Sequence, residues 1–314
     1  MSQAVDLPGP LTTAVTAHIP VDLPRRPVVV FAFPGGGYSR GYYDMHHPDL
    51  GGPSQADFHC ARGIVLLACD HLSVGDSSMT IDDISFRQLA AANHGTVVGA
   101  LDLLRAGSLA ADVPPIRPGL VAGMGHSMGG CLGIIQQAHH DSFDVLAVLG
   151  YSGARMRVSA DDLPEGVELI RYLFHTDEEP ASLVEDDLRG VPQPWRSRTM
   201  PARVPQMAQS GLIGEEAARI DVPLFLAAGE RDVIEDLATE PVAFRACDDV
   251  TLFRLRRSAH LHNFAPTREI LWCRLQQWFE VLALWRQDTS SGSAVALASS
   301  SSSTTTSPGS SPDR

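Results

Sequence analysis

Residues 125–129, with the sequence GHSMG, contain the side chain of this 314-residue chain that is best placed to do chemistry. The apolar run 120–124 precedes them and a helical pattern follows, so the serine would lie on a sharp strand-to-helix turn. The flanking glycines let the two arms of such a turn approach each other, and the turn exposes the hydroxyl. The N–H of Met128 would then lie at a helix N-terminus, where it can stabilise an oxyanion. Ser127 is therefore a candidate nucleophile for acyl transfer.

A serine nucleophile needs a base, and the base needs a carboxylate to orient it. Asp232 follows the apolar run 222–228, and His260 follows the run 250–255. Because the carboxyl ends of parallel strands meet at one edge of a sheet, we expect both side chains to lie near Ser127. The chain therefore presents a nucleophile, an acid and a base in that order, each after its own predicted strand.

Three nearby residues compete for two of these roles. Glu230 and Asp236 are alternative acids, since each lies close to Asp232 in the sequence. His262 is an alternative base if the strand before it ends later than the apolar run indicates.

The elements that must position these residues alternate along the chain. Six short apolar runs are typical of strands covered on both faces, and they span residues 28–33, 64–69, 120–124, 145–149, 222–228 and 250–255. Longer stretches with helical spacing lie between them, at residues 86–105, 128–139, 239–246 and 268–287. The alternation predicts an α/β fold with a mainly parallel central sheet and helices on both faces.

Residues 152–220 interrupt this alternation with prolines and short helical pieces, at 165–174 and 206–219. A long insertion between two strands predicts a helical lid over the active site, set into a core made of residues 1–151 and 221–287. Extra helical packing at the sheet edge is the alternative. The apolar positions of the insertion are consistent with a substrate that carries an apolar group, and include Leu169, Ile170, Leu173, Phe174 and Leu183.

Residues 288–314 differ in composition from the rest of the chain, because serine and threonine dominate them. Such a segment buries too little apolar surface to offset the entropy of ordering it. We therefore predict a disordered tail without a catalytic role.

Together these motifs resemble the serine hydrolases of the α/β-hydrolase fold, and the resemblance covers roughly residues 11–287. It implies that Ser127 attacks a carbonyl, that His260 accepts the proton, and that Asp232 holds the imidazole in the required tautomer. Asp232 matches the G-x-x-D pattern of that family. The family's histidine usually follows a short turn of small residues, which favours His260 over His262.

The resemblance also places a second oxyanion donor in the loop 33–38, which reads FPGGGY. The family usually has a His-Gly motif there, and Pro34 replaces the histidine in this chain. Gly36 is the favoured donor beside Met128, with Gly35 and Gly37 as its neighbouring alternatives.

Residues 70–77, which read DHLSVGDS, resemble the loop D-x-x-G-x-G-x-S that follows the next strand in that family. Ser73 takes the place of the first glycine. The resemblance implies a structural role for this loop.

The composition excludes several classes of protein. The formal charge of 24 − 37 = −13 and the pI of about 5.3 argue against nucleic acid or an anionic membrane as a partner. A mean hydropathy of −0.01 argues against a membrane protein. Five scattered cysteines are typical of reduced thiols, and residues 1–10 lack the features of a secretory signal. We therefore expect a cytoplasmic location.

The remaining polar clusters predict no further site. No group of histidines has the i, i+4 spacing and third ligand of a zinc site, so we expect no metal. The acidic residues at 177–179 and 185–187 are typical of a solvated face. The resemblance implies that no cofactor takes part.

The resemblance implies a hydrolase that cleaves a small-molecule carboxylic ester, thioester or lactone through an acyl-enzyme, with an apolar acyl or alcohol group. Cofactor-free haloperoxidases, acyltransferases and carbon–carbon bond hydrolases of this fold keep the serine and stay open. A ligand-binding protein without catalysis is the alternative from another class. Epoxide hydrolases and haloalkane dehalogenases have aspartate where this chain has Ser127. A homo-oligomer stays open as well, because an edge strand or the last helix could pair two copies.

Overall fold

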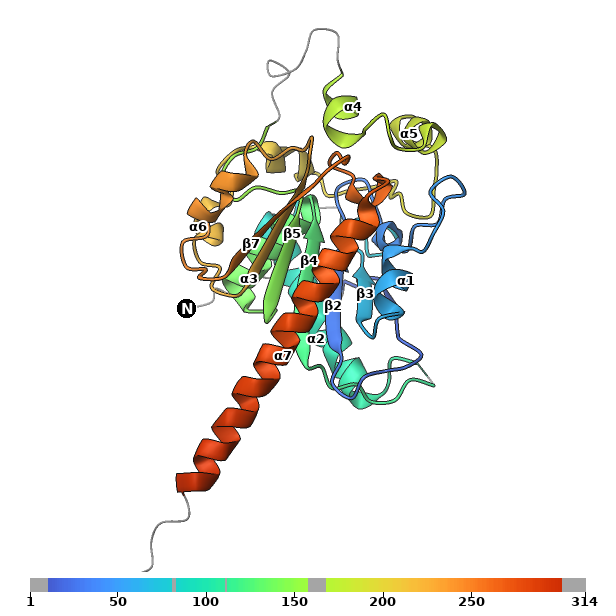
Figure 1. Cartoon of the computed structure of the whole chain (residues 1–314). Coiled ribbons are helices and arrows are strands. Elements are labelled where there is room, and N and C mark those ends of the chain that lie inside the picture. The colour runs from blue at the N-terminus through green and yellow to red at the C-terminus, as the bar shows by residue number, and fades with distance from the viewer. Residues whose placement is uncertain (1–10, 81–82, 111, 158–167, 301–314) are drawn as a thin grey trace, which may run out of the picture.

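A computed structural model of the chain describes residues 11–80, 83–110, 112–157 and 168–300 (Figure 1). Within these residues, seven strands form one sheet in the order β1-β3-β2-β4-β5-β6-β7. β1 pairs antiparallel with β3, and the other neighbouring strands pair in parallel. The strands are β1 (Val15–His18), β2 (Val28–Phe33), β3 (Val65–Cys69), β4 (Leu120–His126), β5 (Val145–Leu149), β6 (Leu224–Gly229) and β7 (Val250–Leu255).

The six apolar runs form β2 to β7, which confirms the predicted, mainly parallel sheet. Successive side chains of β2 enter opposite apolar layers: Val29 and Phe31 belong to one, Val30 and Ala32 to the other. The sequence did not predict β1. Its four residues are half-buried and include a threonine and a histidine, so no apolar run marks it.

Helices cover both faces of the sheet, as predicted. The layer with α2 (Phe86–Ala106) and α3 (Met128–His140) packs on one face, and both helices match their expected ranges closely. On the other face, α1 (Gln55–Cys60) packs beside α7 (Arg268–Ser300), which crosses the sheet in Figure 1.

Two helices differ from their predicted ranges. Helix α7 continues past residue 287 to Ser300, so it includes residues 288–300, which the sequence analysis assigned to a disordered tail. No proline occurs in this part before Pro308, and its alanines favour a helix. Residues 301–314 lie outside the described residues. The helix expected at 239–246 is instead a 3-10 segment, η4 (Leu237–Val242), which contains Pro241.

Between β5 and β6, the described part of the insertion contains four short helical segments and no strand: α4 (Leu169–Phe174), α5 (Ala181–Leu188), η3 (Val204–Ala208) and α6 (Gly214–Ala217). The single piece expected at 206–219 is divided between η3 and α6. Gly211 separates them at φ +74°, a left-handed conformation that ends a helical turn. Residues 158–167, where the piece at 165–174 was expected to begin, lie outside the described residues. Figure 1 shows α4 and α5 beyond one end of the sheet.

Candidate active site

Ser127 lies between the end of β4 and the start of α3, with φ +52° and ψ −114°. This is a strained conformation for a residue with a Cβ atom. Two residues before and two residues after the serine, only glycine fits. A Cβ atom on Gly125 would lie 2.2 Å from the carbonyl oxygen of Gly129, and one on Gly129 would lie 2.1 Å from that of Phe33. The close approach of β4, α3 and the end of β2 therefore excludes side chains at Gly125 and Gly129.

His260 and Asp232 reach this turn from the ends of β7 and β6. His260 Nε2 lies 2.9 Å from Ser127 Oγ, and His260 Nδ1 lies 2.7 Å from Asp232 Oδ1. Both side chains are about 1% exposed. With a proton on Nδ1, His260 donates to Asp232 and its Nε2 accepts from the serine hydroxyl. Burial alone would raise the pKa of Asp232, but the charge and hydrogen bonds of His260 and His262 hold it well below the usual value.

The competing residues have other partners. His262 Nε2 lies 3.0 Å from Asp232 Oδ2, so His262 contacts the acid while His260 contacts both the acid and the serine. Glu230 accepts a hydrogen bond from the N–H of Arg257, and Asp236 caps η4 through the N–H of Ala238. The geometry around Ser127 therefore favours Asp232 and His260.

His126, which precedes the serine, had no role predicted from the sequence. This buried ring stacks on Tyr42 with the centroids 5.0 Å apart, and its Nε2 lies 2.7 Å from the carbonyl oxygen of His260. Burial, followed by the neighbouring His260 and His262, lowers its pKa, so a neutral His126 donates from Nε2 to that carbonyl. The one signal in the sequence was a polar residue at the end of an apolar strand.

The loop at residues 33–38 lies against the serine turn. A Cβ atom on Gly35 would lie 3.1 Å from Ser127 Cβ, and one on Gly36 would lie 2.9 Å from Val204 Cγ1 in the insertion. Gly37 has φ +82°, which favours glycine. Met128 opens α3, where first-turn N–H groups have no acceptor within the helix. Met128 and Gly36 as oxyanion donors remain predictions, with Gly35 as the glycine in contact with the turn.

The insertion is hydrogen-bonded to the loops on both sides of the serine. The N–H of His260 donates to the carbonyl oxygen of Leu173 (2.9 Å), and Ser197 N–H donates to that of Gly37 (2.9 Å). Ser39 donates from its N–H to the carbonyl oxygen of Trp195 and from its hydroxyl to that of Pro194. The segment at 173–174 thus supports the loop after β7 that carries His260. The segment at 194–197 supports the loop at residues 33–38, which we call the glycine loop.

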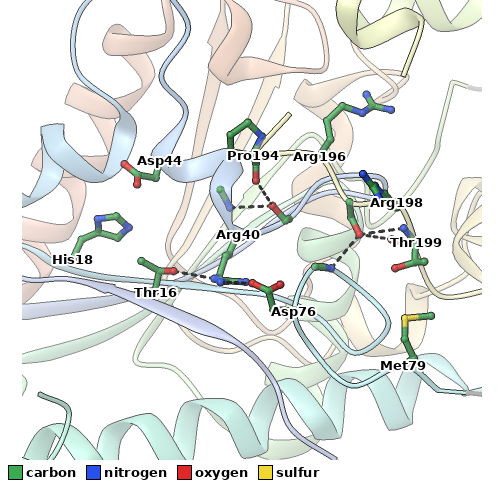
Figure 2. Close-up of a pocket in the computed structure, with 14 residues that line it drawn as sticks. Thr16, His18, Arg40, Asp44, Asp76, Met79, Pro194, Arg196, Arg198 and Thr199 are labelled. Carbon is green, nitrogen blue, oxygen red and sulfur yellow. Dashed lines mark hydrogen bonds and ion pairs between the residues drawn. The ribbon is translucent and has the colours of Figure 1, made fainter. Parts of the chain in front are cut away.

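A polar pocket of about 490 Å³ lies between residues 194–199 and the segments at 39–41 and 75–76. Figure 2 shows Arg40 in it, bonded to Thr16 and Asp76, with Arg196 and Arg198 on the facing segment. Ser127 does not line this pocket, so it lies apart from the candidate nucleophile.

A buried group of charged residues joins α4 and α5 to the glycine loop. His175 Nδ1 lies 3.0 Å from Glu179 Oε2, and its Nε2 lies 3.3 Å from Asp187 Oδ2. Asp187 also pairs with Arg196 and accepts a hydrogen bond from the hydroxyl of Tyr38. The expectation of a solvated acidic face was therefore wrong for Glu179 and Asp187. The Glu179 carboxylate contacts His175 and Thr176, while that of Asp187 contacts the distant Tyr38.

The loop at residues 70–77 has the structural role that the resemblance implies. Ser73 has φ +62°, the conformation for which the family's glycine is suited, and its hydroxyl oxygen accepts the N–H of Thr80. Asp70 accepts the N–H groups of Arg40 and Asp76 and pairs with the Arg40 guanidinium. A Cβ atom on Gly75 would lie 2.2 Å from Asp70 Oδ2.

Among the described residues, Asp44, His46 and Asp57 bring one ligand atom each within 4.8 Å of one another. The group is largely exposed, and exposed acidic residues commonly gather without an ion, so we assign no metal to it. No helix in the described part of the chain is both long and apolar enough to cross a membrane.

The sequence matches no known family model and no curated protein, but the structure resembles solved structures closely in fold. A thermophilic esterase from Thermogutta terrifontis is 14% identical, with a TM-score of 0.63 over 90% of this chain and 97% of that one. Proline iminopeptidase from Mycobacterium smegmatis is 14% identical, with a TM-score of 0.62 over 90% of this chain and 99% of that one. Monoglyceride lipase from Saccharomyces cerevisiae is 14% identical, with a TM-score of 0.58 over 89% of this chain and 94% of that one. The chain therefore has the α/β-hydrolase fold, as the sequence analysis predicted.

Proposed function

We propose that the protein is a serine hydrolase that cleaves a small-molecule carboxylic ester, thioester or lactone through an acyl-enzyme. The observation that carries this proposal is the pair of contacts made by His260, which lies 2.9 Å from Ser127 Oγ and 2.7 Å from Asp232 Oδ1. These contacts link a nucleophile, a base and an orienting acid in one line. The esterase and lipase names of similar structures are consistent with it.

In the acylation step, Ser127 Oγ attacks the carbonyl carbon and its proton passes to His260 Nε2. The imidazolium forms beside Asp232, whose lowered pKa keeps the carboxylate charged. The N–H groups of Met128 and Gly36 donate hydrogen bonds to the negatively charged oxygen of the tetrahedral intermediate. The bond to the leaving group then breaks, and His260 returns the proton to the departing alkoxide or thiolate.

In the deacylation step, His260 removes a proton from water, and the resulting hydroxide attacks the carbonyl carbon of the acyl-serine. The ester bond to Ser127 Oγ breaks, and the serine recovers its proton from His260. A carboxylic acid leaves. For a lactone, both products are one hydroxy acid. These steps require no cofactor.

The proposed substrate carries an apolar acyl or alcohol group. Its support is the apolar side chains that the insertion brings to the site. Phe174 packs on the His260 ring with the centroids 4.6 Å apart, and Val204 lies against Gly36. Met200 Sδ would lie 3.9 Å from a Cβ atom on Gly36. An apolar group would lose less hydration than a charged one on entering such surroundings.

The test is intact mass after treatment with a fluorophosphonate, on the wild type and on Ser127→Ala. We expect one adduct on the wild type and none on the variant. Ser127→Ala should also lose hydrolysis of short-chain and aryl esters by several orders of magnitude. A folded wild type that gains no adduct would contradict the proposal and favour the ligand-binding alternative.

A further inference from the structure

We propose that His262 is a positioning residue: it fixes the carboxylate of Asp232 so that Oδ1 is directed at His260. This inference rests on the proposed function. His262 opens η5 (His262–Phe264), is 1% exposed, and places Nε2 3.0 Å from Asp232 Oδ2. It makes this contact from the same loop that carries His260.

The hydrogen bonds of Asp232 divide evenly between its two oxygens. Oδ1 accepts from the N–H of Val233 (2.7 Å) and from His260 Nδ1 (2.7 Å). Oδ2 accepts from the N–H of Gly229 (2.7 Å) and from His262 Nε2 (3.0 Å). Each oxygen therefore has one backbone donor and one imidazole donor, which occupies all four acceptor positions of the carboxylate.

The two kinds of donor have different effects. The backbone donors belong to the end of β6 and the residue after Asp232, so they fix the carboxylate relative to its own loop. His262 fixes it relative to the loop that follows β7, on which His260 is carried. Without the bond from His262, the bond from His260 would then be, among the described residues, the one side-chain hydrogen bond left between the two loops at this carboxylate.

The surroundings of His262 select the tautomer that this role needs. A donor at Nε2 leaves a lone pair on Nδ1, and Nδ1 is buried without a hydrogen-bond partner among the described residues. A proton there would be a buried donor without an acceptor, which is unfavourable. The titratable groups that face the ring are Asp232, His126 at 5.3 Å between centroids, and His260 at 6.4 Å. His262 therefore donates to Asp232 from Nε2.

The test compares His262→Leu with His262→Gln, using an ester that the wild type hydrolyses. Leucine removes the donor, and the amide of glutamine places an N–H near the former Nε2. We expect kcat to fall about 10- to 100-fold in H262L with little change in KM, which corresponds to the loss of one hydrogen bond to a charged group. H262Q should recover most of this loss. The downfield proton resonance of His260 Nδ1–H should persist in H262Q and weaken or move in H262L.

His59 provides the matched control, because it is also a fully buried histidine with one hydrogen bond, from Nδ1 to Gln276 Oε1 at 2.8 Å. His59→Leu should lower Tm and leave kcat within about twofold. If H262L does not fold, His262→Asn replaces it, since its shorter amide falls short of Asp232.

A folded H262L with the kcat of the wild type would overturn the inference, and so would an H262Q as impaired as H262L. Fluorophosphonate labelling separates this failure from that of the proposed function. If the wild type is not labelled at Ser127, the proposed function fails. If the wild type and H262L are labelled at the same rate, the role of His262 alone fails.

Discussion

Tyr38 and Asp187 are hydrogen-bonded across the boundary between the glycine loop and the insertion, with the tyrosine oxygen 2.8 and 2.9 Å from the two carboxylate oxygens. Burial, followed by the charge of Asp187, holds the pKa of Tyr38 well above its usual value, so the hydroxyl keeps its proton and donates. Tyr38 directly follows the three glycines. Asp187 therefore helps to hold the loop that supplies a proposed oxyanion donor.

The first prediction tests this bond. Tyr38→Phe removes the donor and leaves the ring in place, so the unfolding free energy should fall by about 1.5–3 kcal/mol, as for a hydrogen bond to a charged group. Urea denaturation measures the change. Glu185→Gln, in the helix α5 that contains Asp187, is the control, because its ion pairs with Arg171 and Arg189 are about half-exposed or more and contribute less than about 1 kcal/mol each. Equal effects of the two changes would contradict the assignment.

The second prediction concerns pH. Burial would lower the pKa of His175, but the carboxylates of Asp187 and Glu179 outweigh it and raise the pKa above the ordinary value. A folded-state pKa above the unfolded one stabilises the protein fully below about pH 6.5, and this contribution disappears as pH rises through the raised pKa. Unfolding free energies of the wild type and His175→Gln should therefore converge on the alkaline side. If the difference in unfolding free energy between the wild type and His175→Gln stayed constant with pH, the predicted loss of the His175 contribution at high pH would be wrong.

The third prediction concerns the acid. Asp232→Asn should lower kcat by about 10⁴-fold, because an amide favours the wrong tautomer of His260. The substitution keeps the size of the side chain, so KM should change little. Steady-state kinetics on an aryl ester would measure both values. Glu230→Gln should retain wild-type kcat, since Glu230 contacts the N–H of Arg257; a loss there equal to that of D232N would instead make Glu230 the acid.

The fourth prediction concerns glycines. Gly129→Ala would bring its Cβ within 2.1 Å of a backbone oxygen, so the strand or the helix must shift, and we expect a loss of about 4 kcal/mol or more. Gly95→Ala, inside α2 with nothing within 4 Å of the added atom, should stabilise the protein by about 0.5–1 kcal/mol. Thermal unfolding of both variants measures the contrast. The change in unfolding free energy must have opposite signs in the two variants, and equal signs would contradict the prediction.

The sequence predicted the parts of the fold that depend on local pattern. The apolar runs of β2 to β7 and the apolar face of α2 leave a signal in the sequence, and Gly125 and Gly129 mark the strand-to-helix turn around Ser127. β1 leaves little signal because it is short and half-buried. The division of 206–219 at Gly211 depends on a backbone angle that the pattern of apolar residues does not record.

The candidate site was predicted in its three principal residues because each follows its own strand. Its supporting contacts were not. The bond from His126 to the backbone of His260 joins residues 134 positions apart, and that from Tyr38 to Asp187 spans 149. Such contacts arise from the packing of loops and leave no local spacing to read.

The backbone angles of Ser127 lower the stability of the protein while they expose the hydroxyl group. A residue with a Cβ atom at φ +52° and ψ −114° raises the free energy of the native state by about 1–3 kcal/mol, a cost that glycine largely avoids. Ser127→Gly is thus expected to be inactive yet more resistant to heat than the wild type.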